Sequence, residues 1–236
     1  MKITRLYFLL LAVLIGATAC SNPTRVALRE DKQVRKASDR DQKDQLREIK
    51  DRAVREARQE AKRLERKEDY SVFPGAMPMD KQLERVWMKQ YAENPDGSQK
   101  YLFADGNGVG KTQTAAEMQA MEAAKLQLAG QISNEINQII EGKIANEQID
   151  REKGQSLTKF VAGSKNYIVQ HLQYVKPAFK VYREVGKRDL EVFVKMYYNV
   201  EEAMQAAERA LEAKARAELE QEADLLIDEI NTLLHR

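Results

Sequence analysis

Cysteine and histidine are the scarcest reactive residues of this chain. Its 236 residues include one cysteine, Cys20, and two histidines, His171 and His235. A single thiol excludes an intramolecular disulfide and a cysteine-rich metal site, so the stability of the protein must come from packing. The two histidines lie far apart in the sequence, and neither has a second ligand at a usable spacing. We therefore expect no bound metal ion.

Net charge is also nearly absent, because 39 lysines and arginines face 37 aspartates and glutamates. This balance gives no support to a nucleic-acid partner. The acidic residues are spread along charged segments and lack the apolar surroundings that raise the pKa of a catalytic carboxyl group. No serine stands in the Gly-x-Ser-x-Gly context that exposes a nucleophile; the serines considered are Ser133, Ser156 and Ser164. The sequence predicts a non-enzymatic protein without a cofactor.

Long apolar runs are confined to the N-terminus. Lys2 and Arg5 precede an apolar stretch over residues 6–15, and the small residues 16–19 lead to Cys20. This pattern predicts a secretory signal peptide over residues 1–19, which is too short to span a bilayer as a helix. Its removal takes away two basic residues and leaves 37 of each sign. The alternative is an uncleaved signal or an inert cysteine.

A signal that ends in small residues and then cysteine resembles the bacterial lipobox, although Ala17 holds the place that Leu usually takes. The resemblance implies lipidation of Cys20 and a membrane anchor with the two or more acyl chains that stable attachment needs. Ser21 at the next position implies sorting to the outer membrane. No acidic cluster follows Cys20, so we expect a protein that faces the periplasm.

After Pro23, the segment of residues 20–69 contains none of the residues that interrupt helices. Glycine, proline and aromatic side chains are all absent between Arg25 and Glu68. The charged residues of both signs support a helix through pairs such as Glu48 and Arg52. A thin apolar stripe could face a partner; it consists of Leu46, Ile49, Ala53, Ala57 and Leu64. The segment is predicted to be a charged helical stalk, with a disordered linker as the alternative.

Residues 70–99 form a junction between two turn-rich clusters. The segment 73–78 contains Pro74 and Pro78, and a second cluster occupies residues 94–98. Between them, Leu83, Trp87 and Tyr91 recur every fourth residue. This spacing predicts a short helix whose aromatic face packs on the domain that follows.

Residues 100–199 carry the patterns of an α+β domain. We expect a strand at 101–104, a flexible glycine-rich loop at 106–110, and a helix that Thr112 caps and that ends near Leu128. Ile132, Ile136 and Ile140 predict a half-buried strand over 131–141. Helical spacing returns at 157–172, an antiparallel hairpin follows at 179–198, and residues 200–236 form one long helix. This order predicts a small antiparallel sheet with helices on one face.

The segment from Asp105 to Thr112 resembles a phosphate-binding loop, because it follows a strand and opens a helix. Its candidate ligand residues are Gly110, Lys111 and Thr112. However, Asp105 stands where that motif requires glycine, and its carboxylate would repel the phosphates. The acid-containing run at 225–229 lies at helical spacing, and the signal peptide directs the chain away from the cytoplasmic nucleotide pool. A small-ligand or nucleotide site at 105–112 is the alternative function.

The opening of this domain resembles the Lpp-twenty lipoprotein family. The resemblance rests on the pattern Tyr101-x-x-Ala104-x-Gly106-x-Gly108, followed by the spaced residues Thr112, Ala116, Ala120, Ala124, Leu128, Ala129 and Ile132. The strand that begins at Leu190 occupies the place of the closing strand of that family. The resemblance covers residues 101–200 and implies a dodecin-like α+β domain on an outer-membrane lipoprotein. We therefore expect a structural or protein-interaction module whose partners are envelope proteins or further copies of itself.

Overall fold

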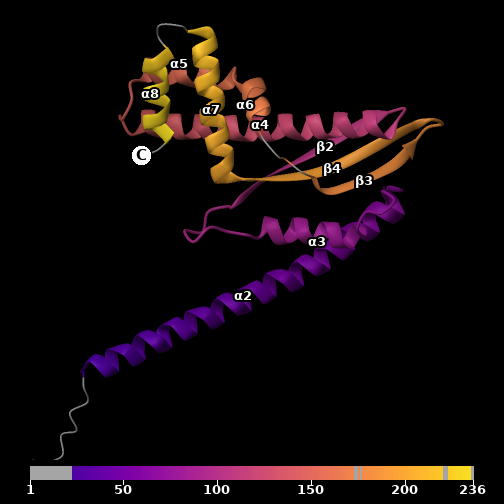
Figure 1. The fold of residues 1–236 in the computed structure, drawn as a ribbon, viewed down its shortest axis with the longest axis horizontal. Helices are drawn as coiled ribbons and strands as arrows, with labels where there is room; N and C mark the ends of the chain where they lie inside the picture. Colours follow the sequence, from indigo (N-terminus) through magenta and orange to yellow (C-terminus); the bar gives the residue numbers. More distant parts are fainter. Residues whose placement is uncertain (1–22, 173–174, 176, 220–222, 235–236) are drawn as a thin grey trace, which may run out of the picture. The chain divides into compact units, whose positions relative to one another are not determined.

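The computed structural model describes residues 23–172, 175, 177–219 and 223–234. The predicted signal peptide and Cys20 lie outside the described residues. The chain divides into two compact units, residues 1–48 and 49–236. Helix α2 (Pro23–Lys67) contributes to both units, and its described residues confirm the helical alternative for this segment (Figure 1). None of the described helices combines the length and the apolar composition that crossing a membrane requires.

The second unit contains a four-stranded antiparallel sheet in the order β1-β3-β4-β2. Its strands are β1 (Ser71–Val72), β2 (Tyr101–Gly110), β3 (Pro177–Val185) and β4 (Asp189–Asn199). The predicted hairpin is confirmed as β3 and β4, which Gly186 joins with a φ of +66°. The left-handed backbone of this glycine closes the turn without steric cost. The mixed helix and sheet content confirms the α+β class.

One face of the sheet is covered by α4 (Gln113–Ala145), as Figure 1 shows. Alternate residues of β4 point into the core beneath this helix because successive side chains of a strand face opposite sides; these residues are Val192, Val194, Met196 and Tyr198. The helix contributes small residues every fourth position, namely Ala116, Ala120 and Ala124. Small side chains allow its backbone to lie close to β2.

The strand predicted over residues 131–141 is wrong, because α4 continues without interruption to Ala145. Ile132, Ile136 and Ile140 are all buried in the main core. A spacing of four residues repeats on one side of a helix, whereas a half-buried strand requires a spacing of two. The helix that was expected to end near Leu128 is therefore 33 residues long.

A second helical layer packs on the C-terminal half of α4. It consists of α5 (Arg151–Ala162), α6 (Lys165–His171), α7 (Val200–Glu218) and α8 (Ala223–Leu234). The prediction of helix over 157–172 is confirmed, with a break at Gly163 and Ser164. The single long C-terminal helix is wrong, since α7 ends before Leu219 and α8 begins at Ala223. Two shorter helices that pack against each other bury Ile227, Ile230 and Leu233.

The opposite face of the sheet is not free, so the expectation of helices on one face only is wrong. The short predicted helix is α3 (Met79–Gln90), and it packs on this second face (Figure 1). Leu83 is fully buried there together with Phe179 and Val181 of β3. Ala57, Ala61 and Leu64 of α2 belong to the same apolar cluster. From Ala53 onward, the stripe predicted to face a partner is buried within the unit.

Candidate functional site

The predicted lipidation site, Cys20, lies outside the described residues. The first described residue is Pro23, where α2 begins. Described side chains in the first unit are exposed along this helix, and they include Lys36, Arg40, Lys43 and Asp44. Leu46, at the start of the predicted apolar stripe, exposes 58% of its surface.

The glycine-rich segment is not a loop, which corrects the expectation for residues 106–110. Strand β2 runs through Gly110, and each of its residues pairs with β4. A Cβ atom on Gly106 would lie 2.0 Å from the carbonyl oxygen of Ala120, and one on Gly108 would lie 2.2 Å from that of Ala116. The glycines therefore allow α4 to rest directly on the strand. The geometry of a phosphate-binding loop is absent from this described segment.

The three candidate ligand residues occupy the junction of β2 and α4. Gly110 is the last residue of the strand, and Lys111 is exposed. Thr112 is confirmed as the N-cap, since its hydroxyl oxygen accepts a hydrogen bond from the amide of Ala115 at 3.2 Å. Asp105 lies on the other face of the sheet, where Lys195 Nζ is 3.0 Å from its Oδ2 atom. The Thr112 contact serves the strand-to-helix connection, whereas the Asp105 contact joins β2 to β4.

Glutamines of α4 occupy part of the free edge of β2. The amide of Val200 donates to the carbonyl of Lys100, so the antiparallel alternation directs the backbone groups of Phe103 and Asp105 away from β4. Gln131 Nε2 donates to the carbonyl of Phe103 at 2.7 Å. Gln127 Oε1 accepts from the amide of Asp105 at 2.8 Å. Side chains thus satisfy edge groups that would otherwise be open to another strand.

A side chain also occupies part of the opposite edge of the sheet, next to β1. Strand β1 pairs with only two residues of β3. Next to it, Gln82 Oε1 of α3 accepts from the amide of Lys180 at 3.0 Å, while its Nε2 donates to the carbonyl of Met77 at 2.7 Å. The glutamine is buried, and both ends of its amide group are used. The periodicity of the sequence gave no signal for these edge contacts.

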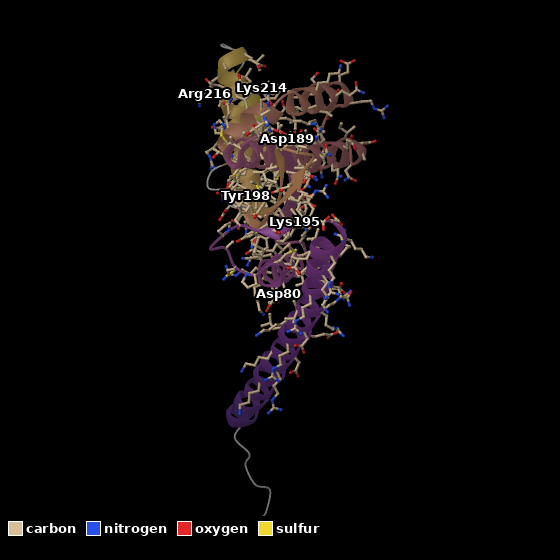
Figure 2. The ribbon with its side chains drawn as sticks, turned by 90° about the vertical axis from the view of Figure 1, so that its right-hand side faces the viewer. Asp80, Asp189, Lys195, Tyr198, Lys214 and Arg216 are labelled. Atoms are coloured by element: carbon tan, nitrogen blue, oxygen red, sulfur yellow. The ribbon has the colours of Figure 1, made fainter. Side chains whose placement is uncertain are left out.

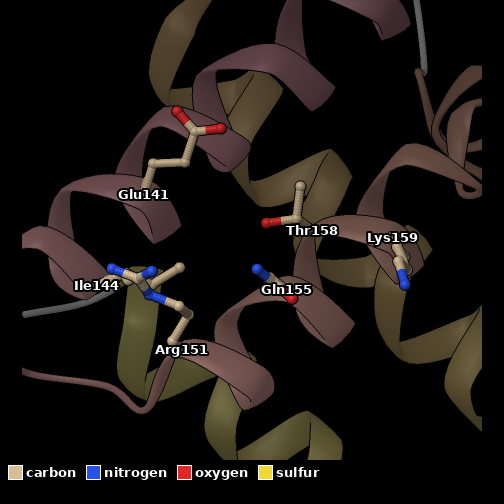
Figure 3. A pocket seen from close by; sticks show the side chains of 6 residues that line it. All are labelled: Glu141, Ile144, Arg151, Gln155, Thr158 and Lys159. Carbon is tan, nitrogen blue, oxygen red and sulfur yellow. The ribbon is translucent and has the colours of Figure 1, made fainter.

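A hollow of about 400 Å³ lies between α4 and α5, and Figure 3 shows its lining. The lining residues are Glu141, Ile144, Arg151, Gln155, Thr158 and Lys159. The side chains of Gln155 and Thr158 point into this hollow, and Lys159 lies at its border. Thr158 Oγ1 donates to the carbonyl of Gly154 at 3.0 Å, so it is engaged with its own helix. The lining mixes both signs of charge without a concentration of either.

A second hollow, of about 450 Å³, lies between α2 and α3. It is lined by Glu56, Gln59, Glu60, Arg63, Val86, Trp87, Gln90 and Lys195. The carboxylate of Glu60 contacts other residues of the lining. Trp87 Nε1 donates to Glu60 Oε2 at 3.2 Å, and Lys195 Nζ lies 4.0 Å from Oε1. The indole ring of Trp87 also stacks on Tyr91. The polar contacts within this hollow therefore converge on Glu60.

The end of α2 is joined to the sheet by a cluster around Tyr70. The hydroxyl of Tyr70 donates to Glu191 Oε1 at 3.1 Å, and Arg183 Nε donates to Glu191 Oε2 at 2.7 Å. The guanidinium of Arg183 also lies over the Tyr70 ring. Burial, reinforced by the carboxylate of Glu191, raises the pKa of Tyr70 to about 12. The cluster fixes the chain where it leaves the helix.

Candidate catalytic and metal-ligating residues are dispersed in the described part of the chain. His171 Nδ1 lies 2.8 Å from the carbonyl oxygen of Tyr167, and His235 is outside the described residues. The described residues contain no group of three histidine, cysteine or acidic side chains that could hold a metal ion. Each serine considered above donates to a helix carbonyl: Ser133 to Val161, Ser156 to Glu152, and Ser164 to Phe160.

A buried lysine was not predicted from the sequence. Lys214 of α7 is 6% exposed, and its ammonium group donates to the carbonyl of Phe160 at 2.9 Å near the C-terminus of α5. Figure 2 labels this residue and Lys195, which lies on the sheet. A cation at the C-terminal end of a helix compensates the partial negative charge of the last carbonyl groups. The charge of Lys214 thus joins two helices of the second layer.

Comparison with known proteins gives no relative from which a function could be transferred. No family model matches the chain, and neither curated proteins nor solved structures provide a match.

Proposed function

We propose that this protein is a non-enzymatic lipoprotein of the bacterial envelope. Cys20 carries the lipid that attaches it to the outer membrane, and the folded unit faces the periplasm as a structural or protein-interaction module. Attachment through acyl chains needs no membrane-spanning helix. The partners are envelope proteins or further copies of the chain.

The observation that supports this proposal most is the position of α2. The helix begins at Pro23, directly after the predicted lipidation site, and runs for 45 residues. A charged helix in this place acts as a stalk between lipid and domain. At 1.5 Å per residue, the part of the helix in the first unit accounts for a reach of about 40 Å.

The resemblance to the Lpp-twenty family belongs to the same proposal. Strand β2, helix α4 and the β3–β4 hairpin follow each other in the expected order and form an antiparallel sheet. This order supports a dodecin-like domain. The helical layer of α5 to α8 and the packing of α3 on the second face are additions to that pattern.

Two exposed surfaces are the docking sites we propose. The first is the end of the β2 edge at Asn107 and Val109, where strand addition can occur beyond the glutamine contacts. The second is the outer face of α8, where Leu225 exposes 76% of its surface. The glutamines at Phe103 and Asp105 limit the first site to a short stretch of backbone.

The lipid anchor is tested with Cys20→Ser. We expect the wild-type chain to incorporate labelled palmitate and to remain with the outer membrane after alkaline washing, whereas the variant loses both properties. Ser21→Ala is the matched control, because it alters the neighbouring residue without removing the thiol. An unlabelled wild-type chain, or a labelled Cys20→Ser chain, would refute the anchor.

The docking surfaces are tested by cross-linking in intact cells with three lysine substitutions at exposed apolar positions. Val109→Lys places a charge at the strand edge, Leu225→Lys places one on α8, and Met118→Lys places one on α4, where 67% of the side chain is exposed. We expect Val109→Lys or Leu225→Lys to remove a reproducible cross-linked partner that Met118→Lys retains. The absence of any specific cross-link to the wild-type chain would contradict the interaction proposal.

A further inference from the structure

The last third of α2 packs on the folded unit through very small side chains. Its buried residues are Ala53, Ala57, Ala61 and Leu64, which recur on one side of the helix. Three of the four are alanine, so this segment buries little apolar area for its length. By contrast, α4 buries three isoleucines and a leucine in the main core. The contact of α2 is therefore weak for a helix that belongs to a compact unit.

The contact between residues 49–64 of α2 and helix α3, here called the seam, is otherwise made by polar groups. Glu60 accepts the hydrogen bond from Trp87 Nε1 and faces Lys195, while the Arg52 guanidinium lies 5.2 Å from the centre of the Tyr91 ring. The hollow of about 450 Å³ opens along the same seam. Water can replace each of these polar contacts when the helix moves away, which keeps the cost of opening low.

Residues 68–70, which follow this helix, are in contrast held in place by several hydrogen bonds. Asp69 has a left-handed backbone with a φ of +57°, and the amide of Tyr70 donates to the carbonyl of Leu64 at 3.1 Å. Arg183 Nη1 donates to the carbonyl of Glu68 at 3.2 Å. Immediately afterwards, β1 joins the sheet. Residues 65–70 thus connect a weakly held helix to a firmly held strand.

From this contrast we propose that residues 49–64 form a strap, a helical segment that opens from α3 while the sheet and the second helical layer stay folded. Residues 65–67, which lie between the strap and the fixed residues 68–70, are its hinge, and the Glu60–Trp87 contact is its latch. Opening exposes Val86 and Trp87, which line the seam. A pull along α2 would open the strap before it reached the sheet. The proposal concerns the folded unit alone and does not depend on lipidation or on a partner.

The structure provides a matched pair of variants for the test. Glu60→Ala removes the hydrogen bond from Trp87 and the charge next to Lys195. Glu56→Ala makes the same change one helical turn earlier, in the same hollow, at a side chain for which the described residues show no hydrogen bond or ion pair. Both substitutions introduce the best helix former, so their effect on helix propensity is equal.

Hydrogen exchange of the purified full-length chain reports the opening, because a helical segment that has left α3 loses the packing that stabilises it and its amides become able to exchange. In the wild-type chain we expect amides of residues 49–64 to exchange at least about 100-fold faster than those of β4, because local opening costs less than global unfolding. Glu60→Ala should raise exchange of the strap about five- to tenfold, as expected for the loss of one ordinary hydrogen bond at a partly buried site. It should leave β4 unchanged, and Glu56→Ala should change neither segment by more than about twofold.

A second measurement uses Trp87, the only tryptophan of the chain. During denaturation by urea, its emission should shift to the red at a lower concentration than the loss of circular dichroism at 222 nm, and Glu60→Ala should widen this separation. The strap is overturned if its protection equals that of β4, or if the two transitions coincide in the wild-type chain. The latch would be overturned if Glu60→Ala and Glu56→Ala raised the exchange rate of residues 49–64 equally, or if Glu60→Ala left this rate unchanged.

Discussion

Gly106 provides the sharpest test of how β2 and α4 are packed. Replacement with alanine would place a Cβ atom 2.0 Å from the carbonyl oxygen of Ala120 and 2.8 Å from the amide nitrogen of Ala124. Both atoms belong to the backbone of α4, so no side chain can rotate to make room. The helix must move away from the strand, and the core beneath it must open.

The magnitude of this effect follows from two opposing terms. Overpacking of a core costs about 1–3 kcal/mol, and contacts with backbone belong at the upper end of that range. Replacing glycine with alanine restricts the unfolded chain and returns about 0.4–1 kcal/mol. We therefore expect Gly106→Ala to lower the free energy of unfolding by about 2–2.5 kcal/mol. This loss is a large fraction of the roughly 5–15 kcal/mol that stabilises an ordinary domain.

The assay is equilibrium unfolding in urea, followed by circular dichroism at 222 nm. Gly130→Ala is the matched control, because Gly130 lies within α4 and its Cβ position has no neighbour within 4 Å. Alanine is favoured over glycine inside a helix, so this control should gain about 0.8–1 kcal/mol. The two glycine-to-alanine changes are thus expected to have opposite signs.

A flexible loop at residues 106–110 predicts a different result. An unpacked loop would tolerate the additional methyl group, and Gly106→Ala would alter the stability by less than about 0.5 kcal/mol. That outcome would refute the direct packing of α4 on the glycines. It would also support the flexible loop at residues 106–110, where the sequence predicts the alternative ligand site.

Three further changes test other contacts of the folded unit. Tyr70→Phe removes a hydroxyl whose pKa of about 12 exceeds its ordinary value of 10. The protonated hydroxyl contributes its full stabilisation of the fold below pH 10. This contribution is lost as the pH rises to 12. Unfolding measured at pH 8 and at pH 12 should therefore show a wild-type advantage over Tyr70→Phe that falls by about 1–2 kcal/mol, and an advantage that is constant with pH would contradict this cause. Lys214→Ala removes one of the two donors to the carbonyl of Phe160, which keeps the hydroxyl of Ser164. The loss of this hydrogen bond from a charged group should cost about 1–3 kcal/mol in urea unfolding, whereas a cost below roughly 0.5 kcal/mol would show that the Ser164 hydroxyl alone satisfies the carbonyl. Gln131→Ala uncovers a carbonyl at the β2 edge, and light scattering should detect increased self-association, which a strictly monomeric variant would exclude.

Local patterns in the sequence predicted the elements whose residues determine their own conformation. Thr112 at the start of an alanine-rich segment predicted the N-cap of α4, and the alternation around Gly186 predicted the β3–β4 hairpin. The repeat of Leu83 and Trp87 likewise predicted α3. These signals rest on neighbours within a few residues, so no knowledge of the rest of the chain is required.

The errors arose where a local pattern allows two structures. Residues 106–110 contain three glycines, which are common in loops but are also required where a helix lies directly on a strand. The spacing of Ile132 and Ile136 suits a helix better than the predicted strand, and α4 buries both residues. The C-terminal segment has helical spacing throughout, and only the packing of α8 against α7 shows that it is divided.

By itself, the sequence determined the α+β class and the absence of a disulfide within the chain, and it left residues 20–69 open between a helix and a disordered linker. Composition and short-range periodicity carry this information, because they depend on which side chains recur on one face. Only the tertiary structure decided that helices cover both faces of the sheet, that Gln82, Gln127 and Gln131 occupy its edges, and that Glu60 meets Trp87 across a seam. These contacts join residues far apart in the chain, and their energies depend on burial and distance, which appear only when the chain has folded.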